Sequence, residues 1–272
     1  MRTIVHLSDL HFGRVDGALL APLRSRVKAI EPHLVVVSGD LTQRAKPRQF
    51  REAKAFLDTL PQPQVVVPGN HDVPLYNVFQ RFFSPLDKYR RFVSRDLEPE
   101  YVDDEIAVIG INTARSLTWK DGRINRAQVE KVRARVCHLD ERVAKIIVTH
   151  HPFDVPDDHD ERDMVNRAAM AMKVFAACGA DILLAGHIHK AHTGHSAERY
   201  KIPGHSALVV QAGTATSTRV RGEANGFNAL HVTPGAITIE RYEWKPEARD
   251  FTVRDTQRYV HAADGWHRPR EP

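Results

Sequence analysis

The chain has 272 residues, of which 27% are charged and 42% are hydrophobic, as in an ordinary globular protein with one large core. The net charge of +5 permits anionic partners, but it is too small to indicate nucleic acid as the partner. We expect neither a membrane span nor a signal peptide, because every apolar run is short and the first residues lead directly into a strand.

The N-terminal third alternates strands and helices. Apolar runs predict strands at 3–8, 34–38 and 64–67. Apolar residues at helical spacing predict helices at 18–31 and 47–60 between these strands. The order strand, helix, strand, helix, strand is typical of a parallel sheet whose strands are joined by crossover helices.

A polar residue follows each of these three strands. Asp9, Asp40 and Asn70 lie 31 and 30 residues apart, which is the spacing of two βαβ units. Since the carboxyl ends of parallel strands meet at one edge of the sheet, the three side chains should converge there. Ligands of open α/β sheets bind at this edge.

The rest of the chain contains more strands than helices. The expected elements are strands at 106–111, 145–149, 181–185, 206–212, 227–233 and 236–242, and helices at 125–137 and 164–178. We assign 1–243 to one domain and 244–272 to a polar, Arg-rich tail that packs partly on it. Segment 74–104 has two open interpretations, a solvated helical insertion or a cap over the substrate.

The two cysteines, Cys137 and Cys178, are far apart in sequence, and neither belongs to a metal-binding pair. We therefore expect neither a disulfide framework nor a thiolate zinc site. This cysteine usage is typical of a reducing compartment and predicts a cytoplasmic protein.

Residues of the types that commonly bind metals follow five of the predicted strands. They are Asp9 and His11, Asp40, Asn70, His150, and His187 and His189. An isolated pair of this kind would be weak support for a metal site, whereas the full ordered set is specific. Carboxylate, amide and imidazole ligands without thiolate suit Mn, Fe, Co, Ni or Zn rather than Ca or Mg.

Three segments, SGDLTQ at 38–43, GNHD at 69–72 and HHP at 150–152, carry a resemblance to a known family. Over about residues 1–240 the chain resembles the calcineurin-like metallophosphoesterases, and in these segments their bacterial cyclic-nucleotide phosphodiesterase branch. The resemblance implies an α/β fold, a four-layer αββα sandwich with two mixed β-sheets and a dinuclear metal site at the strand ends.

The resemblance also implies roles for individual residues. It assigns Asp9, His11 and His189 to a first divalent transition metal ion, Asn70, His150 and His187 to a second, and Asp40 to both as a bridge. His71, next to Asn70, is expected to contact the phosphate and donate a proton to the leaving oxygen, and the alternative is a structural histidine of the loop. Protein Ser/Thr phosphatases of the superfamily carry Asp-Arg-Gly where this chain has Gln43-Arg44-Ala45, and Glu where it has Asp72, which counts against that branch.

Several further residues have open roles. His151 is expected to support the site rather than bind metal. His192 and His195 could line the rim of the site or be structural. Arg115, Arg219 and Arg221 are candidate phosphate contacts.

These inferences predict a metal-dependent phosphodiester hydrolase. Its substrate would be a 3',5'-cyclic nucleotide or another small phosphodiester, attacked by a hydroxide that bridges the metal ions. The alternatives are hydrolysis of a phospholipid, a nucleotide-sugar pyrophosphate or a phosphomonoester, and a basic nuclease that binds nucleic acid. The oligomeric state stays open.

Overall fold

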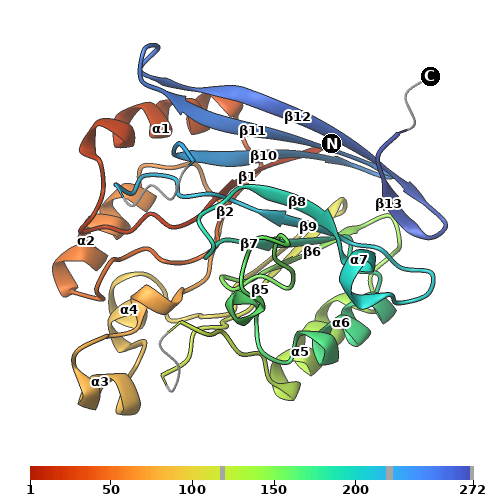
Figure 1. Ribbon diagram of the computed structural model, residues 1–272, viewed down its shortest axis with the longest axis horizontal. Coiled ribbons are helices and arrows are strands. Elements are labelled where there is room, and N and C mark those ends of the chain that lie inside the picture. The colour runs from red at the N-terminus through yellow and green to blue at the C-terminus, as the bar shows by residue number, and fades with distance from the viewer. Residues whose placement is uncertain (117–119, 219–222, 270–272) are drawn as a thin grey trace.

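The computed structural model describes residues 1–116, 120–218 and 223–269. Two β-sheets pack face to face, and helices cover the outer face of each (Figure 1). Both sheets mix parallel and antiparallel strands. The expected αββα sandwich with two mixed sheets is confirmed.

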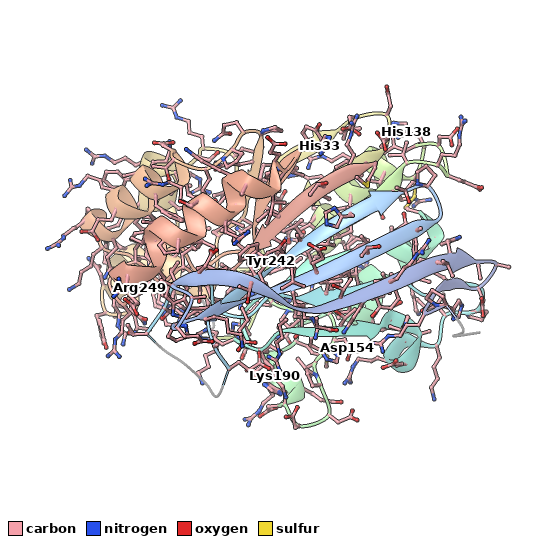
Figure 2. All side chains as sticks on the ribbon, turned by 90° about the horizontal axis from the view of Figure 1, so that it is seen from above. His33, His138, Asp154, Lys190, Tyr242 and Arg249 are labelled. Atoms are coloured by element: carbon pink, nitrogen blue, oxygen red, sulfur yellow. A yellow bond between two sulfur atoms is a disulfide. The ribbon has the colours of Figure 1, made fainter. Side chains whose placement is uncertain are left out.

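The first sheet has seven strands in the order β13-β12-β11-β10-β1-β2-β3. Their bounds are β1 Arg2–Leu7, β2 Leu34–Val37, β3 Gln64–Val66, β10 Gly226–Thr233, β11 Ala236–Lys245, β12 Asp250–Ala262 and β13 Gly265–His267. The helices near its outer face are α1 Gly17–Ile30, α2 Pro47–Leu57 and α4 Asp87–Phe92, and α3 Val78–Phe83 lies beyond α4, farther from the sheet. Figure 2 shows Tyr242 where α1 lies beside the strands of this sheet.

The second sheet has six strands in the order β4-β5-β6-β7-β9-β8. Their bounds are β4 Glu100–Val102, β5 Ile106–Gly110, β6 Ala144–Val148, β7 Ile182–Ala185, β8 His192–His195 and β9 Leu208–Gln211. The associated helices are α5 Arg126–Val136, α6 Ala168–Ala177 and α7 Ser196–Tyr200. Short 3₁₀ helices span Asn70–Asp72 and Glu161–Asp163. No helix in the described ranges is long and apolar enough to cross a bilayer.

Three apolar clusters hold the four layers together. The cluster between the sheets includes Ile4 and Val36 of the first sheet and Ile146 and Leu184 of the second. The other two clusters fill the outer interfaces, one beneath α1 and α2 and one beneath α5 and α6. Strands such as β2 are buried on both faces, which explains its unbroken run of apolar residues.

The strand register fixes the position of the polar residues. β1, β2 and β3 are parallel neighbours, with His6 paired to Val36 and Val36 to Val65. Their carboxyl ends therefore meet at one edge of the sheet, as the 31- and 30-residue spacing predicted.

The C-terminal region differs from the expected tail. β12 is a strand of 13 residues that pairs along β11, and β13 returns against it. Trp266 is only 3% exposed and belongs to the cluster between the sheets. Its Nε1 donates a hydrogen bond to Asp181 Oδ1 at 3.0 Å. Residues 250–267 therefore extend the first sheet instead of lying on it.

The prediction about the cysteines was wrong. Cys137 and Cys178 form a disulfide. Each lies at the C-terminal end of a helix, α5 or α6, and these helices pack side by side over the second sheet. The 41 residues between the two cysteines concealed this proximity.

Segment 74–104 is partly integral to the fold. β4 pairs with β5, and the Tyr89 hydroxyl donates to the Val66 carbonyl at 2.9 Å, which ties α4 to the first sheet. Phe79, Phe82 and Phe83, by contrast, are exposed.

Removal of the Trp266 side chain tests whether the C-terminal strands belong to the core. We expect Trp266→Ala to lower the free energy of unfolding by about 3–5 kcal/mol, because it opens a cavity between the sheets and removes the donor to Asp181. The exposed neighbour variant His267→Ala should change it by less than about 0.5 kcal/mol. Urea denaturation measures both, and equally small losses would contradict the packing described.

Candidate metal centre

The site lies where strands from both sheets end. Asp9, Asp40 and Asn70 follow β1, β2 and β3 closely, while His150 and His187 follow β6 and β7. His11 and His189 are two residues beyond Asp9 and His187. The structure thus brings together all seven residues that the sequence selected as candidate ligands.

Backbone strain is concentrated in this group. Asp9, His11, Asp40, His187 and His189 all have positive φ angles, between 49° and 75°. Residues with a side chain rarely adopt this left-handed conformation, and they keep it mainly where the surrounding structure and a function require it. Five of the seven candidate ligands are therefore held in an unfavourable conformation that directs their side chains to one point.

The first group consists of Asp9, His11 and His189. Asp9 Oδ1 lies 3.4 Å from His11 Nε2 and 3.2 Å from His189 Nε2, and these nitrogens are 3.2 Å apart. The other oxygen, Oδ2, accepts hydrogen bonds from the Ser8 hydroxyl and the His187 amide. Oδ1 is buried and has no donor among the described residues. Asp9 therefore turns an unsatisfied oxygen toward two imidazole nitrogens.

The second group consists of Asn70, His150 and His187. Asn70 Oδ1 lies 3.0 Å from His150 Nε2 and 3.1 Å from His187 Nδ1. His150 Nδ1 donates to the Ser38 carbonyl at 2.8 Å, so the Nε2 of a neutral His150 presents a lone pair to the Asn70 oxygen. A positive charge, either a proton or a metal ion, must lie between these acceptor atoms.

Asp40 connects the two groups. Its Oδ2 lies 3.8 Å from His11 Nε2 in the first group, and its Oδ1 lies 3.4 Å from His150 Nε2 in the second. Oδ1 also accepts a hydrogen bond from the His71 amide at 2.8 Å. Each carboxylate oxygen therefore faces a different group.

The carboxylates of the site stay ionised although they are buried. Burial alone would raise the pKa of Asp9 and Asp40, but nearby imidazoles hold both pKa values well below their ordinary range: mainly His189 for Asp9, and His150 and His71 for Asp40. Burial lowers the pKa of His150, but the charge of Asp40 outweighs this effect and raises it to about 9. The site thus attracts positive charge strongly.

The spacing of these atoms fits metal ions. Nitrogen and oxygen ligands at about 2.0–2.2 Å from a divalent ion lie about 3.0–3.5 Å from each other. Most of the distances within the two groups fall in this range. Two ions could be held, with Asp40 between them, and the assignment of individual ligands stays a prediction.

Gly69 and Asp72 hold the loop that carries Asp40 in place. A Cβ atom at position 69 would collide with the Asp40 carboxylate, so only glycine allows this approach. The buried Asp72 carboxylate accepts hydrogen bonds from the amides of Gly69, Leu41 and Thr42. These bonds join the loop after β2 to the loop after β3.

His71 lies beside the two groups of candidate ligands, at the wall of a cavity of about 240 Å³. Its Nδ1 donates to the Gln43 carbonyl at 2.9 Å, and its Nε2 lies 4.0 Å from Asp40 Oδ2. The ring therefore presents Nε2 toward the region between the two groups. Further residues that line the cavity are Gln43, Arg44, Val73, Leu75, Lys120 and Asp163.

The sequence did not identify the cations of this cavity. Arg44 and Lys120 line it, whereas Arg115 does not, because its guanidinium donates to the Asn112 and Ala114 carbonyls and to Gln128. Arg115 is therefore a structural residue. The candidates Arg219 and Arg221 lie outside the described residues.

The structure also places the three further candidate histidines. Both ring nitrogens of His151 are engaged, one with the Lys120 carbonyl and one with the Thr113 hydroxyl, which agrees with a supporting role. His151 also lies close to His150 and His187, with which it could hold a metal ion, so this role stays a prediction. His192 and His195 lie on β8 and are not among the residues that line the cavity.

Comparison with known proteins agrees with this geometry. A sequence model described as calcineurin-like phosphoesterase matches residues 2–191, a range that contains all seven candidate ligands and His71. The chain belongs to the calcineurin-like phosphoesterase family.

This chain has low sequence identity to two curated proteins that it matches. The uncharacterized protein YpbG of Bacillus subtilis (strain 168) is 27% identical over 191 residues, 69% of this chain and 61% of that protein. The 3',5'-cyclic adenosine monophosphate phosphodiesterase CpdA of Escherichia coli (strain K12) is 24% identical over 202 residues, 69% of each chain. The match thus spans less than two thirds of the length of YpbG.

A solved structure shows the same fold. Purple acid phosphatase PPD1 from yellow lupin (Lupinus luteus) seeds superimposes with a TM-score of 0.70 at 13% identity. The superposition covers 94% of the chain described here and 53% of the lupin chain.

Substitution of Asp40 tests whether it serves both groups. We expect Asp40→Asn to weaken metal binding by about 10–100-fold or more, because a neutral amide replaces the carboxylate shared by the two groups. Metal analysis after dialysis measures this loss, with the exposed variant Asp160→Asn as the control. If Asp40→Asn retained as much metal as the control, Asp40 would not be a bridge.

Proposed function

We propose that this chain is a dinuclear-metal-dependent phosphodiester hydrolase that acts on a small diester, with a 3',5'-cyclic nucleotide as the first candidate. The observation that carries the proposal is Asp40, whose two oxygens face two separate groups of candidate ligands. The similarity to CpdA supports the substrate class.

The proposed ligand set consists of Asp9, His11 and His189 for one ion, Asn70, His150 and His187 for the other, and Asp40 for both. Two bound transition metal ions would supply a hydroxide nucleophile and stabilise negative charge at the phosphorus atom. The residues of the chain orient the ions, and the orphaned Asp9 Oδ1 and the acceptor atoms around Asn70 support this assignment.

We assign proton transfer to His71. The Gln43 carbonyl fixes the ring through Nδ1, which leaves Nε2 to hold a proton beside the leaving oxygen of a bound diester. Arg44 and Lys120 provide positive charge for the phosphate, and Val73 and Leu75 provide an apolar wall for the organic part of the substrate.

The cytoplasmic location stays a prediction. The Cys137–Cys178 disulfide weighs against it, because disulfides persist mainly in oxidising compartments.

The metal preference follows from the ligand atoms. Four imidazoles among the seven proposed ligands favour transition metals. After chelation, we expect Mn²⁺ or another transition ion to restore diester hydrolysis, and Mg²⁺ alone to leave it largely absent. Full recovery with Mg²⁺ alone would show that the proposed ligand set is wrong.

The role of His71 is tested by the leaving group. A ribose alkoxide needs a proton as the P–O bond breaks, whereas a nitrophenolate leaves without one. We expect His71→Ala to slow a cyclic or alkyl diester by about 10²–10⁴-fold and a nitrophenyl diester clearly less.

Asn70→Ala provides the comparison for this experiment. It should slow both substrates alike, because it weakens a metal group that both of them require. The ratio of kcat values for the two esters is the measurement, and equal losses in His71→Ala would reject the proton-donor role while leaving the metal assignment intact.

A further inference from the structure

Helix α3 has an inverted polarity. Its Arg81 is 4% exposed and donates to the Pro74 carbonyl at 3.0 Å, whereas Phe79 and Phe83 are 72% and 76% exposed. The rings of Phe79 and Phe83 contact each other, with centroids 4.7 Å apart. A helix that buries its arginine and exposes its aromatic rings is unfavourable in water unless another surface covers it.

The exposed apolar residues follow directly in the chain on a residue that lines the metal-site cavity. The aromatic patch consists of Tyr76, Val78, Phe79, Phe82 and Phe83. Leu75, the preceding residue, lines the cavity, and so does Arg44, whose guanidinium lies 5.5 Å from the centre of the Tyr76 ring.

The part of the chain that contains the aromatic patch is basic. Residues 44–95 contain ten Lys and Arg but four Asp and Glu, a net charge of +6, whereas the whole chain has +5. This range includes α2 and α4, which pack together through Phe50, Tyr89 and Phe92, and α4 lies next to α3 in Figure 1. The excess positive charge of the protein therefore lies in the part of the chain that contains the patch, and the remaining residues are close to neutral.

Either a second copy of the chain or an anionic apolar surface could cover the patch, and the positive charge of this region decides between them. In a symmetric pair of copies, the same surface meets itself, so the two positive regions would repel each other. A bilayer has an apolar interior that can accept the aromatic rings, and anionic headgroups at its surface can pair with the basic residues.

We propose that the aromatic patch and the basic residues of α2 and α4 bind the surface of an anionic phospholipid bilayer. The phenylalanines enter the interface, and the arginines of α2 and α4 pair with anionic headgroups. Because Leu75 and Arg44 belong to the cavity wall, binding places the mouth of the cavity at the lipid surface. The proposal does not depend on the proposed catalytic function, since binding requires no turnover.

Vesicle sedimentation tests the proposal. The whole chain should sediment with vesicles of phosphatidylcholine mixed with phosphatidylserine, and much less with pure phosphatidylcholine. Binding should weaken as salt is added. Phe79→Ser combined with Phe83→Ser should reduce binding about tenfold or more, while Val253→Ser, an exposed apolar residue of β12, should leave it unchanged.

A matched charge control is available. Arg90 pairs with Asp87, and Arg133 on α5 pairs with Glu130 in the same i,i+3 arrangement. We expect Arg90→Glu to weaken binding to anionic vesicles and Arg133→Glu to have little effect. Thermal unfolding of all variants verifies that they are folded.

Three results would overturn the proposal. The first is a wild-type chain that does not bind anionic vesicles, and the second is a double serine variant that binds them as the wild type does. The third is a wild-type dimer in analytical ultracentrifugation that becomes monomeric in the double serine variant without any vesicle binding. This third result would identify the aromatic patch as a contact between copies.

Discussion

The buried carboxylate of Asp40 is the constraint on which the rest of the site depends. One oxygen faces His11 and the other faces His150, so this side chain sets the distance between the two groups of candidate ligands. Its position excludes any side chain at Gly69. It also requires the backbone of Asp40 itself to be left-handed. The loops after three strands are thus shaped around one charge.

A pair of buried carboxylates is costly unless donors and positive charge surround it. The structure provides specific donors for only part of this demand: Ser8 and the His187 amide for Asp9, and the His71 amide for Asp40. The remaining oxygen of Asp9 has no donor among the described residues. Metal ions would satisfy the rest, which explains why the strained left-handed residues are gathered here.

The sequence predicted the convergence of Asp9, Asp40 and Asn70 because strand pattern and spacing are local properties, and parallel pairing brings their ends together. It could not predict the Cys137–Cys178 disulfide, since 41 residues of intervening chain say nothing about distance. The cavity cations were missed for a similar reason: loop conformation, not residue type, decides which arginines and lysines face a site. The exposed rings of α3 could not be predicted either, because periodicity reveals an apolar face but not what it packs against.

The most direct test of the account is anomalous diffraction from crystals of the manganese-loaded protein. The account predicts two peaks about 3.5–4 Å apart, one beside each oxygen of Asp40. The first should contact Asp9, and the second should contact Asn70. A single peak, or two peaks of which only one contacts Asp40, would contradict the central role given to this carboxylate.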